Sequence, residues 1–192
     1  MIPLLNPAPP WPRDPVTLLH GCVASGAVEI LKHGVDPTKG RLDADFGQGF
    51  YLTTSLRQAR HWAWLKFYDL APSKQTASGG PVVLSFTLPL AQIATLDSIV
   101  FVRGDYAYDD YWSMVQHCRQ SSSVAPQNHR NTADLSPTPD NWYDLVFGPV
   151  ATHWEQRSVM AESDQISFHT TRAAALLSAC RPARLAVAPV IP

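Results

Sequence analysis

The sequence is poor in charged residues and in cysteine. Charged side chains make up 16% of the 192 residues, and 15 Lys and Arg nearly balance 16 Asp and Glu. A net charge of -1 argues against a protein that wraps nucleic acid by broad electrostatic attraction, although a local basic patch stays open. The three cysteines, Cys22, Cys118 and Cys180, form no CxxC pair. Their number and spacing argue against a disulfide scaffold and a cysteine zinc site.

Long apolar runs and metal-binding spacings are also missing. No segment approaches the ~18 apolar residues that cross a bilayer. The first 15 residues hold six prolines and lack the basic start of a secretory signal. We therefore expect a cytoplasmic protein, or one delivered into a target cell without a recognisable signal peptide. The histidines show neither H-x-x-x-H nor H-E-x-x-H spacing, so we expect no metal.

The composition that remains is that of one globular domain. Hydrophobic residues make up 45% of the chain, enough to build a packed core. We expect a proline-rich arm over residues 1–15, a folded domain over 16–180 and a tail over 181–192. Strand-like and helix-like patterns alternate along the domain, which predicts a mixed α+β fold.

The elements follow from local patterns. We expect strands over Val16–Leu19, Gly49–Thr53, Pro81–Pro89, Tyr143–Phe147 and Gln165–His169, and helices over Gly26–His33, Leu56–Phe67, Tyr106–His117 and Thr171–Ser178. Ser25 and Ser55 are the expected N-caps, and Gly34 the expected left-handed stop. Val28 and Leu31 are spaced for one buried helix face. The polar stretch Arg119–Asn141 is predicted to be a long loop that contacts a substrate.

Three short motifs stand out. His20-Gly21 follows a short apolar run, DFGQGFYLTT covers Asp45–Thr54, and QISFHT covers Gln165–Thr170. Taken singly, each has an ordinary structural explanation. A histidine at a strand end is usually a structural hydrogen-bonding group, the glycines fit a turn, and Tyr51 and Trp62 fit a core. Cys22, beside the His-Gly pair, could be a nucleophile or, more simply, a small buried residue.

Together with QARHWA and YDLVFGPV, in this order, these motifs resemble the ADP-ribosyltransferase superfamily. The likeness is to its poly(ADP-ribose) polymerase and diphtheria-toxin side, and closest to small bacterial members. It covers about Leu18–Leu177, nearly the whole chain. The resemblance implies split mixed β-sheets flanked by helices, with NAD bound between them as co-substrate.

The resemblance also assigns roles. His20 would hydrogen-bond the adenosine ribose, and the Gly21 backbone would hold the nicotinamide carboxamide. Tyr51 would stack on the nicotinamide ring, Trp62 would close the other side, and Thr53 shares the strand face of Tyr51. The serine that bonds the carboxamide in other members falls on Ala59.

Gln165 stands where the best-known relatives carry a glutamate. Period-two alternation puts Gln165 on the cleft side of its strand and Ile166 and Phe168 toward the core. A glutamine can hold a ribose hydroxyl but cannot take up a proton, and losing a general base typically costs ~10²–10⁴-fold. The alternatives are a mono-transferase that needs no carboxylate here, a binder without chemistry, or an engineered substitution. Glu162 and Asp164 precede Gln165 by three and one residues, and such an odd spacing along a strand would put their side chains on the opposite face. We therefore expect neither to replace it.

The function expected from the resemblance is NAD-dependent mono-ADP-ribosyl transfer to a macromolecule, with His20, Tyr51 and Gln165 as the catalytic triad and release of nicotinamide. The expected acceptor is a macromolecule, either a protein or a nucleic acid. The alternatives are an NAD glycohydrolase and a non-catalytic NAD- or ADP-ribose-binding module. A bacterial toxin or effector role, with an inhibitor or antitoxin partner or a partner docked on the proline arm, is a further expectation.

Overall fold

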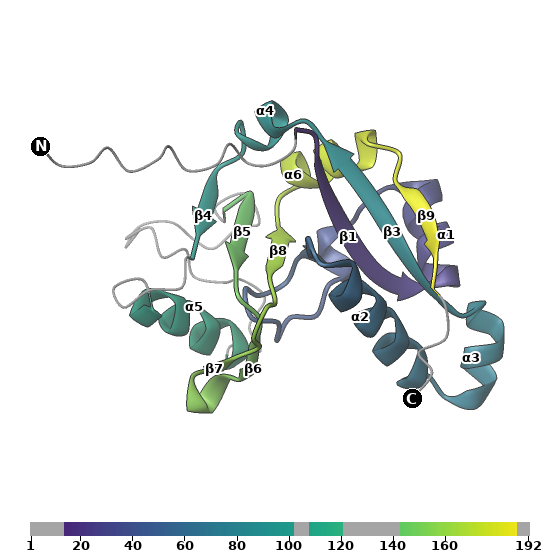
Figure 1. Ribbon diagram of the computed structural model, residues 1–192, viewed down its shortest axis with the longest axis horizontal. Coiled ribbons are helices and arrows are strands. Elements are labelled where there is room, and N and C mark those ends of the chain that lie inside the picture. The colour runs from purple at the N-terminus through teal and green to yellow at the C-terminus, as the bar shows by residue number, and fades with distance from the viewer. Residues whose placement is uncertain (1–13, 102–107, 121–142, 188–192) are drawn as a thin grey trace, which may run out of the picture.

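The computed structural model describes residues 14–101, 108–120 and 143–187 of the chain (Figure 1). Residues 1–13 of the expected arm and 121–142 of the expected loop lie outside this part. The elements in chain order are β1 Val16–Val23, α1 Ala24–His33, η1 Pro37–Lys39, β2 Phe50–Leu52, α2 Leu56–Tyr68, α3 Pro72–Ser78, β3 Pro81–Leu88, α4 Leu90–Ile93, β4 Ser98–Val100, α5 Tyr108–Gln120, β5 Leu145–Gly148, β6 Ala151–His153, η3 Trp154–Gln156, β7 Ser158–Val159, β8 Gln165–Phe168, α6 Thr171–Ala179 and β9 Ala183–Ala186. This is the mixed α+β fold that the sequence predicts.

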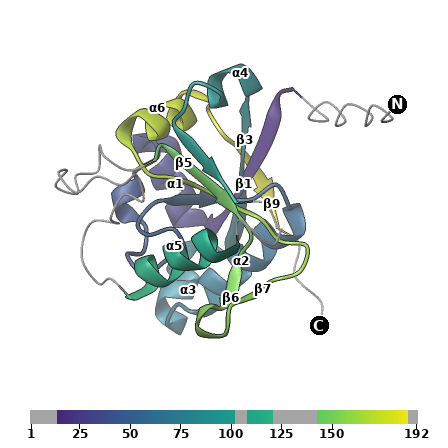
Figure 2. The ribbon, with the colours of Figure 1, turned by 90° about the vertical axis from the view of Figure 1, so that its left-hand side faces the viewer.

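Two main sheets form the framework. The first has the order β1-β3-β9 with antiparallel pairing, and the second has the order β2-β8-β5-β4, in which only β4 and β5 run parallel. Strands β6 and β7 form a separate hairpin-like pair. In Figure 1 the two sheets lie side by side, and Figure 2 turns α5 and the outer side of the second sheet toward the viewer.

The two sheets are joined at one point next to the predicted site. Leu19 of β1 and Thr53, just after β2, exchange backbone hydrogen bonds of 2.8 and 2.9 Å. On its other edge β2 pairs with β8, so that Tyr51 lies opposite Ser167. This junction brings the His20, Tyr51 and Gln165 segments into one region of the molecule.

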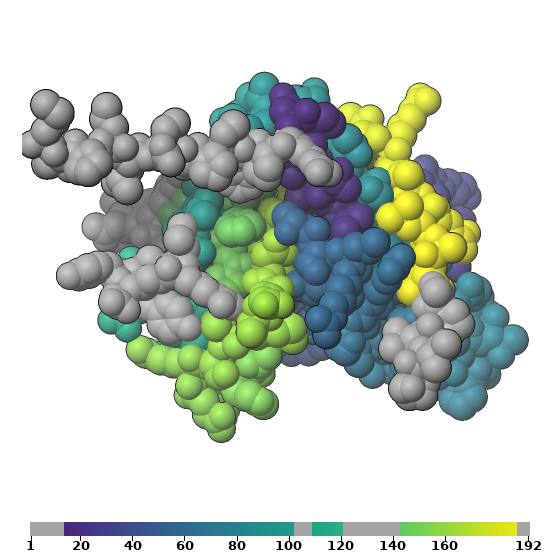
Figure 3. Space-filling view, in the orientation of Figure 1, coloured from purple at the N-terminus to yellow at the C-terminus, as the bar shows by residue number. Residues whose placement is uncertain are grey.

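Three apolar clusters fill the layers. The largest lies between the sheets and includes Phe50, Ile166 and Phe168, as the alternation of β2 and β8 predicts. A second cluster lies on the other face of the second sheet, where Phe46 and Val146 meet α5 residues such as Trp112. A third, smaller cluster lies between α2 and the β1-β3 face. In the space-filling view, α2 (blue) covers the centre of that face, between residues around β8 (green) and β9 (yellow) (Figure 3).

Most helix limits follow their predicted signals. The Ser55 hydroxyl accepts a hydrogen bond from the Gln58 amide at 3.3 Å and caps α2. Gly34 ends α1 with a φ of 85°, and its amide donates to the Ile30 carbonyl. The expected Ser25 cap is wrong. Helix α1 begins earlier, with Val23 at the cap position and no side-chain cap bond.

Two further expectations need correction. Val28 and Leu31 are 51% and 48% exposed, because α1 packs on the sheet through Ala24, Ala27 and the partly buried Ile30. The expected C-terminal tail contains β9, whose backbone pairs with β3 in the register Val82 to Ala186. Apart from residues 188–192, which lie outside the described part, this segment belongs to the folded domain.

Candidate functional site

His20 is held rigidly at the junction of the sheets. Its Nδ1 lies 2.7 Å from the Tyr51 carbonyl oxygen, and its ring stacks on Phe50 with centroids 4.2 Å apart. A carbonyl can only accept, so Nδ1 carries the proton and Nε2 is an acceptor. Burial, and secondarily the Lys66 charge, lower the pKa of His20 to about 3. The imidazole is therefore neutral near pH 7, and Nε2 has no hydrogen-bond partner among the described residues.

Gly21 presents backbone groups at the free edge of the first sheet. Leu19 turns its amide and carbonyl toward Thr53, and Gly21, two residues further along the strand, faces the same edge. The Gly21 carbonyl accepts a hydrogen bond of 2.8 Å from Lys66 Nζ. A Cβ at Gly21 would lie 2.1 Å from the Ala59 carbonyl oxygen, so α2 can approach β1 only because this residue is glycine.

Tyr51 is anchored through its hydroxyl and its ring. Its hydroxyl donates to the Gly47 carbonyl at 2.7 Å and accepts from the Phe46 amide at 3.0 Å. The ring packs against Phe46 and meets His169 edge-on, with centroids 6.4 Å apart. Burial raises the pKa of the phenol well above its usual value, so Tyr51 stays protonated.

Gln165 is 7% exposed, and both of its amide hydrogens are used. Nε2 donates to Asp45 Oδ2 at 2.6 Å and to the Pro149 carbonyl at 2.8 Å. Its face of β8 is thus covered by the DFGQG segment and by residues after β5. The sequence predicts that this face opens on a cleft. In the structure the second apolar cluster covers most of the face, but Oε1 is not among the fully buried atoms and still meets solvent. The side-chain oxygen Oε1 accepts no hydrogen bond from the described residues.

Asp45 and Arg119 are site residues that the sequence analysis missed. Asp45 is 3% exposed; its Oδ2 also accepts from the Ala151 amide at 2.8 Å, and its Oδ1 accepts from Arg119 Nε at 2.8 Å. Arg119 Nη2 reaches the same oxygen at 2.5 Å. Arg119 belongs to α5 instead of starting the predicted loop. Asp45 is the first residue of the DFGQGFYLTT motif, but nothing in the sequence gave it a role or identified its partner 74 residues away.

Thr53 and Trp62 have contrasting environments. Thr53 is buried, donates its hydroxyl to Asp164 and accepts from the Ser55 amide at 3.0 Å. Asp164 also bonds Thr54 and ties the start of α2 to the segment before β8. Trp62 lies on α2 and is 38% exposed. Its ring lies near that of His61, with centroids 6.3 Å apart, so the predicted sandwich with Tyr51 is not formed by the protein alone.

Other nucleophile candidates are blocked. Burial raises the pKa of the Cys22 thiol to about 11, which keeps the thiol protonated near pH 7. Ser167 bonds His169 Nε2 at 2.7 Å, and Nδ1 of that histidine lies 2.8 Å from the Gln48 carbonyl. This resembles a base-activated serine, but Ser167 has no exposed surface through which a substrate could reach it. Within the described ranges, no group of three or more metal-ligating side chains was found.

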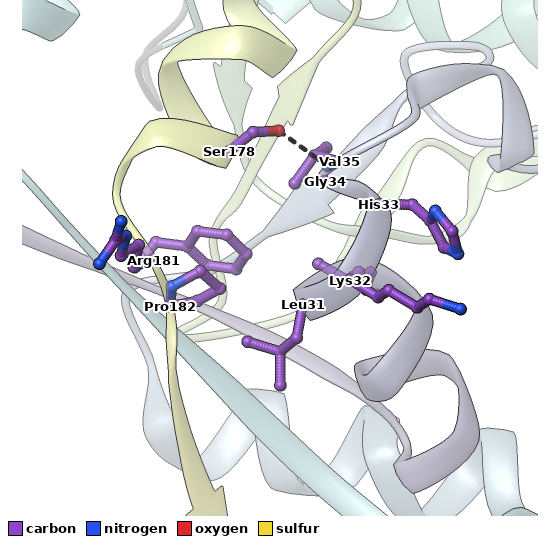
Figure 4. A pocket seen from close by; sticks show the side chains of 10 residues that line it. Leu31, Lys32, His33, Gly34, Val35, Ser178, Arg181 and Pro182 are labelled. Carbon is purple, nitrogen blue, oxygen red and sulfur yellow. Dashed lines mark hydrogen bonds between the residues drawn. The ribbon is translucent and has the colours of Figure 1, made fainter.

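A pocket of about 540 Å³ lies elsewhere, between the end of α1 and the residues that follow α6 (Figure 4). Leu31, Val35 and Pro182 give it an apolar wall, while Lys32 and Arg181 bring positive charge to its lining. Beside the pocket, the Ser178 hydroxyl accepts a hydrogen bond from the Val35 amide. None of the residues that the resemblance assigns to NAD lines this pocket. Among helices in the described ranges, none is long and apolar enough to span a membrane.

Comparison with known proteins places the chain in one family. Residues 24–154 match the family described as "Protein of unknown function (DUF3990)", and the chain belongs to this family. The matched region contains Asp45, Tyr51 and Arg119, whereas His20 and Gln165 lie outside it. No curated protein and no solved structure matches the chain.

Proposed function

We propose that this DUF3990 protein binds NAD at the junction of its two sheets and transfers ADP-ribose to a macromolecular acceptor, releasing nicotinamide. One observation carries the proposal. His20, Tyr51 and Gln165, distant in sequence, lie on strands that meet there, through the His20–Tyr51 hydrogen bond and the β2–β8 pairing. The resemblance implies split sheets, and the presence of two main sheets that meet at this junction supports the proposal.

Two unused acceptors support binding of a ribose-containing ligand. His20 Nε2 and Gln165 Oε1 each lack a hydrogen-bond donor among the described residues. A ribose hydroxyl is a donor that can satisfy either. Because neither group needs to change its protonation state, both can hold hydroxyl groups across the physiological pH range. In this proposal His20 bonds the adenosine ribose and Gln165 the nicotinamide ribose.

The nicotinamide would lie at the Gly21 edge. Its carboxamide can donate to the Gly21 carbonyl, and it must displace the Lys66 ammonium that now occupies that oxygen. The nicotinamide ring of NAD carries a positive charge, and a nearby ammonium repels it more than it repels the neutral nicotinamide that leaves. Trp62, exposed on α2, and Tyr51 supply the rings for stacking.

The reaction in this proposal is a substitution at the ribose C1′. The bond from C1′ to the nicotinamide nitrogen breaks, and its electron pair stays on that nitrogen. A lone pair of the acceptor forms the new bond to C1′, and the acceptor's proton goes to water. Gln165 cannot remove that proton, so catalysis rests on holding NAD in a reactive geometry and on the dipoles that face C1′.

The two alternatives differ in what becomes of the ADP-ribose. An NAD glycohydrolase passes it to water, whereas a binding module leaves NAD intact. The absence of a proton-accepting side chain at Gln165 is the observation that favours the binding module. Incubating the protein with adenylate-labelled NAD and cell lysate separates all three outcomes.

Transfer predicts free nicotinamide and a labelled macromolecule. Protease and nuclease treatment of separate samples then tells whether the label is on protein or nucleic acid. Nicotinamide release with no labelled macromolecule would establish the glycohydrolase, and NAD binding without release would establish the module. Absence of both binding and release would overturn the proposal.

A further inference from the structure

We propose that Asp45 and Arg119 are positioning residues that fix Gln165 as a hydrogen-bond acceptor, so that this position requires an amide instead of a carboxylate. The orientation is a property of the fold, and its use toward the NAD ribose rests on the proposed function above. The proposal makes Gln165 a native component of the site. It sets aside the interpretations of a lost or replaced glutamate.

The two partners of Gln165 determine which way its amide points. Asp45 Oδ2 and the Pro149 carbonyl oxygen lie 2.6 and 2.8 Å from Nε2, and neither atom carries a hydrogen. Rotating the amide by half a turn would place Oε1 against two acceptors. The side chain therefore has one satisfied orientation, in which both N–H groups are bonded and Oε1 faces away from Asp45.

Asp45 is itself fixed by hydrogen bonds from three residues. The Ala151 amide and Gln165 bond Oδ2, while Arg119 bonds Oδ1 through its guanidinium. A buried carboxylate needs such a charge partner, because removing one member of a buried pair leaves an uncompensated charge and strongly destabilises the fold. Arg119 comes from α5 and is 26% exposed in its side chain. The orientation of the Gln165 amide thus depends on Asp45, and the position of the Asp45 carboxylate depends in turn on Arg119.

A carboxylate at position 165 would be destabilised by the groups around it. It would face the Asp45 carboxylate and the Pro149 carbonyl, both of which repel negative charge. Two carboxyl groups so close share one proton, as a pair. With that proton present, the O–H can donate to its neighbour as the glutamine N–H does. The Gln165→Glu variant should therefore behave like the parent only in acid.

The decisive variant is Gln165→Glu, studied by unfolding and by nicotinamide release at about pH 5 and about pH 8. The variant's carboxyl has a raised pKa when folded, so its stability deficit grows as the pH rises above the unfolded value of about 4.3. We expect a lower melting temperature than the parent at pH 8 and a smaller gap at pH 5. Release of nicotinamide should fall about tenfold or more at pH 8 and recover partly at pH 5.

The Asp45→Asn variant tests whether Asp45 positions Gln165 for the reaction or only stabilises the fold. We expect a loss of about tenfold or more in the release rate with a change in NAD affinity of less than about threefold. Asp43→Asn is the matched control, because Asp43 bonds the exposed Arg41 two residues away and should leave both values unchanged. If the nicotinamide release rate of Asp45→Asn falls only in proportion to its loss of folded protein, the positioning role is overturned. Should this variant not fold, the pH profile of Gln165→Glu decides.

A Gln165→Glu protein as stable and as active as the parent at pH 8 would overturn the inference. This failure is distinct from that of the proposed function. If the parent neither binds NAD nor releases nicotinamide, the function fails, while the melting temperatures of Gln165→Glu still test the amide orientation. Pairwise comparison with the parent at each pH removes the general effect of acid on the fold.

Discussion

Buried polar side chains of this protein differ in whether all their hydrogen-bonding atoms are used. The buried Ser167 and the half-buried Asp164 are satisfied within the fold and tie neighbouring strands together. His20 and Gln165 each make firm bonds through nitrogen and keep one acceptor atom unused among the described residues. Neither acceptor atom is fully buried, so a ligand hydroxyl can replace the water that each can bind.

Trp62 gives a test of ring stacking at the residue scale. Its side chain is 38% exposed, so Trp62→Ala should change the free energy of unfolding by less than about 0.5–1 kcal/mol. Loss of stacking should weaken NAD binding by about threefold to tenfold. Calorimetric titration with NAD measures this. Tyr68→Ala, also on α2 and 63% exposed, is the control and should bind like the parent.

Replacing Lys66 should strengthen NAD binding, whereas replacing Trp62 should weaken it. Its Nζ occupies the Gly21 carbonyl that the proposed carboxamide contact requires. Lys66→Met should free that oxygen and remove a charge that repels the nicotinamide ring, and NAD affinity should rise by about threefold or more. Lys74→Met, on the separate helix α3, should leave the affinity unchanged. Weaker NAD binding by Lys66→Met would mean that the ammonium binds the ligand itself.

At the scale of elements, the contact between β1 and α2 depends on Gly21. A methyl group there would lie 2.1 Å from the Ala59 carbonyl oxygen and 2.7 Å from the Ala63 amide nitrogen, both backbone atoms that cannot move alone. Gly21→Ala should therefore displace α2 and destabilise the protein by about 3 kcal/mol or more. Chemical denaturation measures the change.

Gly26 provides the matched control for Gly21. It lies inside α1, and a Cβ there would have no neighbour nearer than Val23 Cγ2 at 3.9 Å. Gly26→Ala should stabilise the protein by about 0.5–1 kcal/mol, because alanine loses less backbone freedom in a helix. Equal effects of the two substitutions would contradict the close packing of α2 against β1.

Local signals predicted some elements, and long-range contacts decided the others. The β-branched run before Pro89 predicted β3, and the Ser55 hydroxyl predicted the start of α2. The buried face of α1 was missed because two small alanines pack closer than Val28 and Leu31 can. Strand β9 was missed because its partner is β3, about 100 residues earlier, and no local pattern encodes that pairing.

The candidate site was predictable to the same extent. The motifs located His20, Tyr51 and Gln165, whose strands meet in the structure. They could not reveal that Gln165 bonds Asp45, or that Arg119 balances its charge, because these contacts cross from β8 to a loop and then to α5. Period-two alternation gave the face of Gln165 but not what covers it.

At the scale of the whole molecule, two buried histidines make folding sensitive to acid. Burial lowers the pKa of His20 to about 3 and that of His169 to about 4, whereas in the unfolded chain each takes up a proton near 6.5. The unfolded state therefore binds more protons below pH 6.5, and stability falls as the pH decreases. At pH 5 the loss should be about 2 kcal/mol for each histidine.

Urea denaturation between pH 7 and pH 5 tests this linkage. His169→Gln should lose about half of the pH dependence, since glutamine can keep a hydrogen bond without titrating. A free energy of unfolding that stays constant over this range would contradict the neutral, buried state of both imidazoles.

The central claim is that the junction of the two sheets binds and cleaves NAD, and one measurement tests it most directly. The release of nicotinamide from NAD, in the presence of lysate, is followed for the parent, His20→Ala and Gly26→Ala, with folding checked by circular dichroism. The account predicts release by the parent and by Gly26→Ala, and a loss of about tenfold or more in His20→Ala. Equal release by the parent and a folded His20→Ala protein, or no release by any of them, would contradict it.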